Sequence, residues 1–182
     1  MTYAFTKKEG STTSIGTGPS AGVGGSGPYV YAETSSPRAP GDLFTLTYDG
    51  SACSDTGLGV STVTFYYHMY GAAMGELRVT NAAGEVAWSL SGDQGDSWNA
   101  TTVDIYSPSF AFEYTRGSSW RGDAAVALVN VSCGAGPPSP PPLPPSPPAV
   151  PGKAGTCRDA QDFTSSDSWI SWCPLPRDAL PT

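Results

Sequence analysis

The stretch VTFYYHMY, from Val63 to Tyr70, has the alternating pattern of a strand whose side chains point to opposite faces of a sheet. The two faces differ in polarity, and a strand of this kind requires at least one face to be buried. Phe65, Tyr67 and Met69 lie on the more apolar face, and Tyr66, His68 and Tyr70 lie on the other.

We expect the apolar face of this strand to form the core together with aromatic residues from later segments. Burial of each large aromatic side chain would contribute about 2 to 3 kcal/mol to stability. Such a core is stable without a cofactor, and we expect none. The residues assigned to the core are Phe65, Tyr67, Met69, Trp88, Trp98, Phe110, Phe112 and Tyr114.

Similar short segments precede and follow this strand, separated by Gly, Asp, Asn and Pro. No helical stretch is available to connect parallel strands, so the pattern favours an all-β fold of antiparallel sheets stacked as a sandwich. The expected strands are Tyr29 to Thr34, Leu43 to Tyr48, Val63 to Tyr70, Leu77 to Thr80, Val86 to Leu90, Thr101 to Tyr106, Phe110 to Thr115 and Ala124 to Ser132.

The charge and hydropathy of the chain argue against two classes of partner. Nine Lys and Arg against sixteen Asp and Glu give a formal net charge of -7, and Lys7-Lys8 is the largest basic cluster. A phosphate backbone would be repelled, so nucleic-acid binding is not expected. No apolar run approaches the roughly 20 residues that cross a bilayer, so we expect no membrane segment within this chain.

The cysteines and two glycosylation sequons favour an oxidising compartment. The cysteines lack CxxC spacing, and the single histidine, His68, leaves no Cys/His zinc set, so disulfides are favoured over free thiols. The sequons begin at Asn99 and Asn130. We expect an extracellular or cell-surface location, with the signal peptide upstream of MTYAFTKKEG. The four cysteines are Cys53, Cys133, Cys157 and Cys173.

Composition divides the chain into four parts. Residues 1–27 are rich in Gly, Ser and Thr, and we expect a loop or a degenerate N-terminal part of the module. Residues 28–133 carry the sandwich. Residues 134–153 form a proline-rich linker, and residues 154–182 read as a short irregular fragment of a second module.

The linker is expected to be stiff. Its prolines favour the polyproline II conformation, in which residues 137–151 would span roughly 45 Å. The alternative, a ligand for SH3 or WW domains, is disfavoured because those domains are cytosolic. Beyond the linker, Cys157 and Cys173 could close a small disulfide loop.

Several blocks of this sequence resemble the MAM domain, the adhesion module of meprins and receptor phosphatases. They occur in the family's order and at about its spacing. The Ser-Pro-Pro repeats of the linker resemble extensin-like glycoproteins. The MAM-like blocks are Gly16 to Pro19, Gly27 to Asp42, Phe65 to Gly71, Gly75 to Val79, Trp88 to Trp98 and Arg121 to Val129.

The resemblance implies a jelly-roll sandwich that makes homophilic or heterophilic contacts between extracellular proteins and has no catalytic activity. It also implies that Cys53 replaces a family cysteine and pairs with Cys133. The family's first strand, with its two cysteines, has no counterpart here, which implies an open sheet edge. Ala127 and Leu128 stand where relatives carry an acidic pair, so we expect no metal site.

Three further patterns have a functional and a structural interpretation. Arg121-Gly122-Asp123 is the integrin-binding tripeptide, but the family carries Gly-Asp here as the entry to its final strand. Asp93 and Asp96 could be paired carboxylates or calcium ligands, although a tight turn with Gly95 at positive φ is favoured. No GxSxG or HExxH motif accompanies the histidine, so we expect a histidine of the sheet and no catalytic residue.

The row of Tyr66, His68 and Tyr70 is the candidate interaction face. Such a row can stack on sugar rings or anchor a protein partner, unless another sheet covers it. We therefore weigh three functions. The first is a protein-interaction module, in which the partner could be a second copy. The second is a carbohydrate-binding module of an extracellular matrix glycoprotein, and the third is an ancillary domain of a secreted peptidase.

Overall fold

The computed structural model describes residues 1–55 and 57–136. Most of the expected linker and the segment with Cys157 and Cys173 lie outside the described residues. The predictions for those parts stay predictions. No helix in the described part of the chain is long and apolar enough to cross a bilayer.

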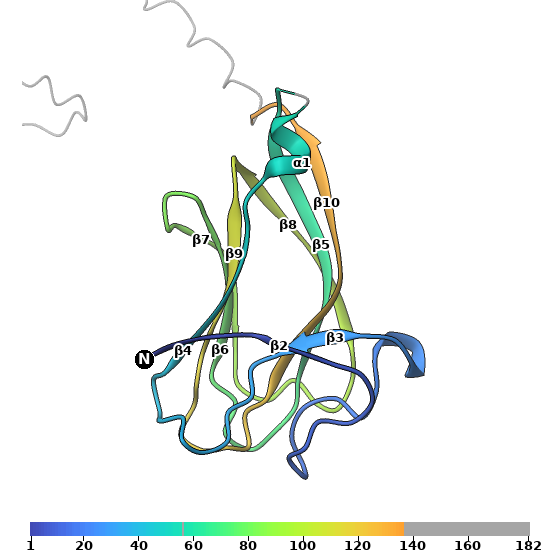
Figure 1. Ribbon diagram of the computed structural model, residues 1–182, viewed down its shortest axis with the longest axis vertical. Coiled ribbons are helices and arrows are strands. Elements are labelled where there is room, and N and C mark those ends of the chain that lie inside the picture. The colour runs from blue at the N-terminus through green and yellow to red at the C-terminus, as the bar shows by residue number, and fades with distance from the viewer. Residues whose placement is uncertain (56, 137–182) are drawn as a thin grey trace, which may run out of the picture. The chain divides into compact units, whose positions relative to one another are not determined.

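Two stacked sheets of five strands each form the module (Figure 1). The first sheet has the order β1-β4-β9-β6-β7, and the second has the order β2-β3-β10-β5-β8. The strands are β1 Thr2–Ala4, β2 Thr6–Lys8, β3 Tyr29–Tyr31, β4 Leu43–Tyr48, β5 Gly59–Met69, β6 Glu76–Asn81, β7 Val86–Ser91, β8 Asn99–Ser107, β9 Phe110–Thr115 and β10 Ala124–Gly134.

Every strand pair is antiparallel except β1 with β4, which is parallel. The connections from β4 to β5, β5 to β6 and β7 to β8 each cross from one sheet to the other, as do those from β8 to β9 and β9 to β10. This alternation is the jelly-roll arrangement of a sandwich. The predicted all-β fold is confirmed.

The structure extends the central strand at its N-terminal end. β5 begins at Gly59, and its first residues pair with the last residues of β10, Ser132 to Gly134. The two longest strands therefore run together up to the short helix α1, Ser51–Ser54, at the top of Figure 1. A disulfide joins Cys53 of this helix to Cys133 of β10 with a Cα–Cα distance of 5.3 Å.

The core between the sheets contains most of the expected aromatic residues. Phe65 and Phe112 face each other from opposite sheets, with ring centroids 4.8 Å apart and an edge-on geometry. Phe110, Tyr114 and Met69 are also buried, as predicted. The expectation is corrected at the periphery. Tyr67 and Trp88 are only partly buried and pack against the core, and Trp98 lies outside it.

Trp98 belongs to a second apolar cluster, on the outer face of the second sheet. There it packs with Tyr29, Tyr31, Ala125 and Ala127. These residues alternate with the core residues of their strands and therefore point away from the first sheet. The first residues of β10, Ala124 to Ala127, are therefore buried on both faces of the sheet.

Residues 1–27, expected to form a loop or a degenerate N-terminal part of the module, contain two short paired strands. β1 pairs with β4 in the first sheet, and β2 pairs with β3 in the second. Phe5, the single residue between the two strands, contacts Phe44 of the core edge-on. The first residues of the chain therefore join the two sheets, as the blue trace of Figure 1 shows.

Candidate interaction surfaces

The residues of the candidate interaction face do not form an open row. His68 is 2% exposed, and Tyr66 and Tyr70 are half-buried. The ring of His68 lies edge-on to Trp98 with a centroid distance of 5.4 Å. A loop therefore lies over His68, while Tyr66 and Tyr70 stay partly exposed, and the role of this row as an interaction face stays a prediction.

The covering loop comes from the N-terminal part of the chain. Its backbone is held at three points: Tyr29 Oη donates to the carbonyl of Gly10, Gly18 N donates to the carbonyl of Tyr70, and Trp98 Nε1 donates to the carbonyl of Ala21. The distances are 2.6, 3.0 and 2.9 Å. These tethers fix the loop on the outer face of the second sheet.

His68 also contacts a carboxylate at the surface. Its Nε2 lies 3.1 Å from Oδ1 of Asp96, which is more than half exposed. Burial lowers the pKa of His68, and the nearby Asp96 carboxylate opposes that change only in part. His68 is therefore neutral at pH 7, and its buried Nδ1 has no hydrogen-bond partner among the described residues.

Two polar recesses open between the loop and the sheet. They have volumes of about 160 and 250 Å³, and Pro19, Ser20 and Asp96 line both of them. The first also contacts His68 and Trp98, and the second also contacts Tyr70, Ile15 and the hydroxyl groups and backbone of the loop. The recesses offer hydrogen-bonding groups beside aromatic rings.

The turn between β7 and β8 carries Asp93 and Asp96. Asp93 Oδ1 accepts hydrogen bonds from the backbone N–H of Gly95 and Gly71. Gly95 has φ +83°, the left-handed conformation that the sequence predicted for this turn. The two carboxylates have different partners, because Asp96 faces His68. In the described residues, no group of three or more His, Cys, Asp and Glu is placed to bind a metal.

The Arg-Gly-Asp tripeptide is not displayed. Asp123 is fully buried, and its Oδ1 accepts hydrogen bonds from both the backbone N–H and the hydroxyl of Thr34, at 3.0 and 2.8 Å. The backbone N–H of Asp123 donates to the hydroxyl of Thr17 in the N-terminal loop. The aspartate therefore connects Thr34 and the N-terminal loop to the start of β10. An integrin metal could not reach its carboxylate.

The environment of Asp123 disfavours its ionised form. Burial raises its pKa from 3.8 to about 6, against the lowering effect of the hydrogen bonds from Thr34. The other carboxyl oxygen, Oδ2, is buried and has no hydrogen-bond partner among the described residues. A proton on Oδ2 would leave an uncharged acid that still accepts both bonds at Oδ1.

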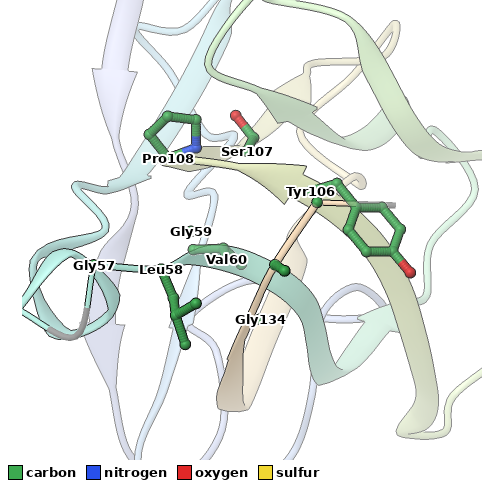
Figure 2. A pocket seen from close by; sticks show the side chains of 10 residues that line it. Gly57, Leu58, Gly59, Val60, Tyr106, Ser107, Pro108 and Gly134 are labelled. Atoms are coloured by element: carbon green, nitrogen blue, oxygen red, sulfur yellow. The ribbon is translucent and has the colours of Figure 1, made fainter. Parts of the chain in front are cut away.

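A third recess, of about 290 Å³, lies at the disulfide end of the sandwich (Figure 2). Leu58, Val60, Tyr106 and Pro108 line it together with backbone of residues 134–136. Tyr106 has φ +44° and is 42% exposed, on the solvent-facing side of β8 between the buried Ile105 and Ser107. This recess offers an aromatic ring and an aliphatic side chain to a partner.

The predicted glycosylation sites differ in exposure. Asn130 is exposed on β10, whereas Asn99 is half-buried at the start of β8 and donates from Nδ2 to the carbonyl of Ser97. Val131, which follows Asn130 in β10, packs on the core, so the Asn130 side chain points to the outer face of the sheet.

The fold and these surfaces define a disulfide-closed jelly-roll module of the kind that cell-surface proteins use. The chain belongs to the MAM domain family (meprin/A5/mu), whose model matches residues 5–134. The match begins within the stretch that composition set apart as a loop.

The chain is similar to MAM domain-containing glycosylphosphatidylinositol anchor protein 1. The identity is 37% over 134 residues for the protein of Gallus gallus and 38% over 136 residues for that of Homo sapiens. The alignments cover 68% and 66% of this chain and 14% of each relative. Anchor protein 2 of Mus musculus is 37% identical over 65% of this chain and 14% of its own length. The chain thus spans a small part of these relatives.

Among solved structures, the K2 cleaved adhesin domain of Lys-gingipain superposes with a TM-score of 0.44 and 16% identity. The superposition covers 60% of this chain and 74% of that chain.

Sequence reasoning missed the hydrogen-bond network at the base of the sandwich. Thr17, Thr34 and Asp123 are far apart in the sequence and meet only because the loop folds over β3 and β10. The available signal was the pair of family-like blocks that contain Thr17 and Asp123. Leu58 and Tyr106 of the third recess gave no such signal.

Proposed function

We propose that this chain is a non-catalytic interaction module that acts outside the cell or at its surface, where it binds another extracellular protein. Membership of the MAM family carries this proposal, because the aligned relatives are named as glycosylphosphatidylinositol anchor proteins. Such an anchor holds a protein to a membrane surface. The Cys53–Cys133 disulfide supports the same location, since disulfides persist in oxidising compartments.

The third recess is the surface that best suits a protein partner. An aromatic ring with limited flexibility contributes contact area at low entropic cost, and a neighbouring aliphatic side chain adds apolar area. Tyr106 and Leu58 supply these two groups, and both are more than one-third exposed. The nearby disulfide and the long strands β5 and β10 keep the recess in a fixed geometry.

Beads coated with the full chain test this function. We expect them to capture a partner from extracellular protein displayed on cells, and we expect Tyr106→Asp and Leu58→Asp to reduce capture about tenfold. Val86→Asp is the matched control, since Val86 is 53% exposed on the edge strand β7 and does not line the recess. Capture that no recess substitution changes would exclude this surface, and a chain that captures nothing would contradict the function.

The polar recesses favour a second candidate function, the binding of saccharides. Tyr70 and Trp98 provide ring faces and edges, while Asp96 and the loop hydroxyls provide hydrogen-bonding groups. A glycan array with the full chain tests it. Binding to defined glycans that Asp96→Ala and Tyr70→Ala abolish would support this function, and an array without signal would reject it.

The hypothesis of an ancillary domain in a secreted peptidase concerns the whole protein rather than this module. The full-length transcript tests it directly. A peptidase domain encoded beside the MAM domain would support this hypothesis.

A further inference from the structure

Two loops meet at the end of the sandwich opposite α1 (Figure 1). One joins β3 to β4 over residues 32–42, and the other joins β9 to β10 over residues 116–123. The hydroxyl of Thr34 donates to the carbonyl of Trp120, and Nε of Arg116 donates to the carbonyl of Thr34, both at 2.8 Å. The loops therefore form one continuous surface. Three of the four described arginines lie on them: Arg38, Arg116 and Arg121.

The carboxylates of the two loops are already engaged in the fold. Glu33 accepts three hydrogen bonds from nearby hydroxyl and backbone groups. Asp42 accepts hydrogen bonds from the backbone of its own loop and from the amino group of residue 1, and Asp123 is fully buried. Among the residues that the structure describes, none of the three arginines forms an ion pair, whereas the fourth, Arg78, pairs with Glu113 at 2.7 Å.

Arg38 and Arg121 each lie over an aromatic ring. The guanidinium carbon of Arg121 is 4.9 Å from the ring centroid of Trp120. The guanidinium carbon of Arg38 is 4.7 Å from the ring centroid of Tyr3, on β1. Neither arginine side chain donates a hydrogen bond within the described part of the chain. Because a ring restrains the guanidinium group, less conformational entropy is lost when that group binds a ligand.

We call Tyr3, Arg38, Trp120 and Arg121 the arginine surface. Trp120 is 40% exposed and Arg121 is also exposed, so the Arg-Gly-Asp tripeptide displays its arginine although its aspartate is buried. Tryptophan, tyrosine and arginine are the residue types that most often dominate the energy of protein–protein interfaces. A guanidinium group binds a carboxylate through two parallel hydrogen bonds. The arginine surface therefore suits the acidic side chains of another protein.

The charge of the whole chain narrows the class of ligand further. With a formal net charge of -7, the chain repels a long polyanion over most of its surface. A sulfated polysaccharide carries charge along its whole length and meets this repulsion. A short acidic segment of a protein carries its charge only where it contacts the two arginines.

We propose that the arginine surface binds an acidic segment of another extracellular protein, whose Asp or Glu side chains accept hydrogen bonds from Arg38 and Arg121. This inference rests on the proposed function and gives the module a second contact surface. That surface lies at the opposite end of the sandwich from the third recess, which is close to the disulfide.

A short labelled poly-L-glutamate peptide serves as the probe, and fluorescence anisotropy measures its binding to the full chain. We expect saturable binding at about 50 mM salt that weakens at about 300 mM, because salt screens exposed charges. We expect Arg38→Glu and Arg121→Glu each to weaken binding at least about fivefold. Lys7→Glu is the matched control, since it changes the net charge equally from an exposed lysine on β2, outside both loops.

Two milder variants separate guanidinium recognition from charge alone. Arg121→Lys keeps the charge but loses the planar pair of donors, and Trp120→Ala keeps every charge but removes the ring that restrains Arg121. We expect each to weaken binding about threefold. Circular dichroism checks that all variants fold, and both substituted side chains are exposed.

Several results would overturn the inference. They are no saturable binding at low salt, equal losses in Arg121→Glu and Lys7→Glu, and full binding by both milder variants. Heparin that binds through the same arginines at least about tenfold more tightly than the peptide would also overturn it, in favour of a sulfated polysaccharide. A chain that ignores the peptide while its beads still capture a protein would reject the arginine surface and leave the proposed function standing.

Discussion

Asp123 is the residue whose role changes most between sequence and structure. Its place in an Arg-Gly-Asp tripeptide suggests an exposed ligand, yet the carboxyl group is fully buried and joins Thr34 to the start of β10. The three residues Arg121-Gly122-Asp123 do not by themselves reveal whether the aspartate is buried. Its burial depends on the N-terminal loop, which folds across the start of β10. The favoured interpretation, a structural Gly-Asp entry to the last strand, agrees with this geometry.

The buried carboxyl group makes stability depend on pH. Its pKa is about 6 in the folded chain against an ordinary 3.8, so between these values the folded state binds more protons than the unfolded state. The free energy of unfolding should therefore fall by about 2 to 3 kcal/mol as pH rises from about 4 to 7. Asp123→Asn should remove this decrease, because the amide stays uncharged.

Urea unfolding of both proteins at several pH values measures the effect. His68 acts in the opposite direction: burial lowers its pKa, so acidification below its ordinary 6.5 destabilises the fold. Since both proteins retain His68, the difference between their curves isolates Asp123. Parallel curves for wild type and Asp123→Asn would contradict a buried, protonated Asp123.

Asn130 and Asn99 lead to a prediction about glycan occupancy. Asn130 is exposed, while Asn99 is half-buried and its amide already donates a hydrogen bond to Ser97. We expect a chain secreted from animal cells to carry a glycan at Asn130 in most molecules and at Asn99 in fewer. Intact-mass spectrometry of Asn130→Gln and Asn99→Gln measures this, and equal mass losses in the two variants would contradict it.

At the scale of elements, strands β3 to β10 could be predicted from the sequence, including the edge strands β7 and β8, whereas the N-terminal strands β1 and β2 could not. β4 and β9 match their expected bounds because aromatic or aliphatic residues alternate along their whole length. β1 and β2 have three residues each and gain their structure from neighbours distant in the sequence. So short an alternation is too weak a signal in a segment rich in Gly, Ser and Thr.

Trp98 supplies one of the side-chain contacts that hold the N-terminal loop to the sheet. Trp98 Nε1 donates to the carbonyl of Ala21, and Trp98→Phe would remove this bond while retaining an aromatic ring. We expect a loss of about 1 kcal/mol in stability and faster amide exchange in the loop. Hydrogen exchange by mass spectrometry measures both. Unchanged exchange over residues 10–27 would show that Trp98 does not hold the loop.

The disulfide stabilises the element pair β5 and β10 at its far end. Because Cys53 and Cys133 are separated by 80 residues, loop closure in the unfolded chain implies a contribution of about 4.5 kcal/mol. The double variant Cys53→Ala, Cys133→Ala should lose about 2 to 5 kcal/mol in urea unfolding under non-reducing conditions. A loss below 1 kcal/mol would mean that the bridge constrains little beyond what the sheets already fix.

At the scale of the whole molecule, the sandwich and its family could be predicted, while the usable surfaces could not. Alternation in β5 assigns Phe65 and Met69 to the core, but it cannot show that a loop covers His68. The covering depends on tethers such as Tyr29 to Gly10, which no local pattern reveals. The apolar groove between β4 and β10, which Leu46 and Val129 line, lies beyond the residues at which the short strands β1 and β3 pair.

The central claim is that this chain binds an extracellular partner through its folded surface and performs no reaction on it. The most direct measurement is equilibrium capture of partner on immobilised full chain, followed by intact-mass spectrometry of both proteins after release. The account predicts saturable, reversible capture that requires the intact disulfide and leaves both masses unchanged. No saturable capture, or a partner released with an altered mass, would contradict it.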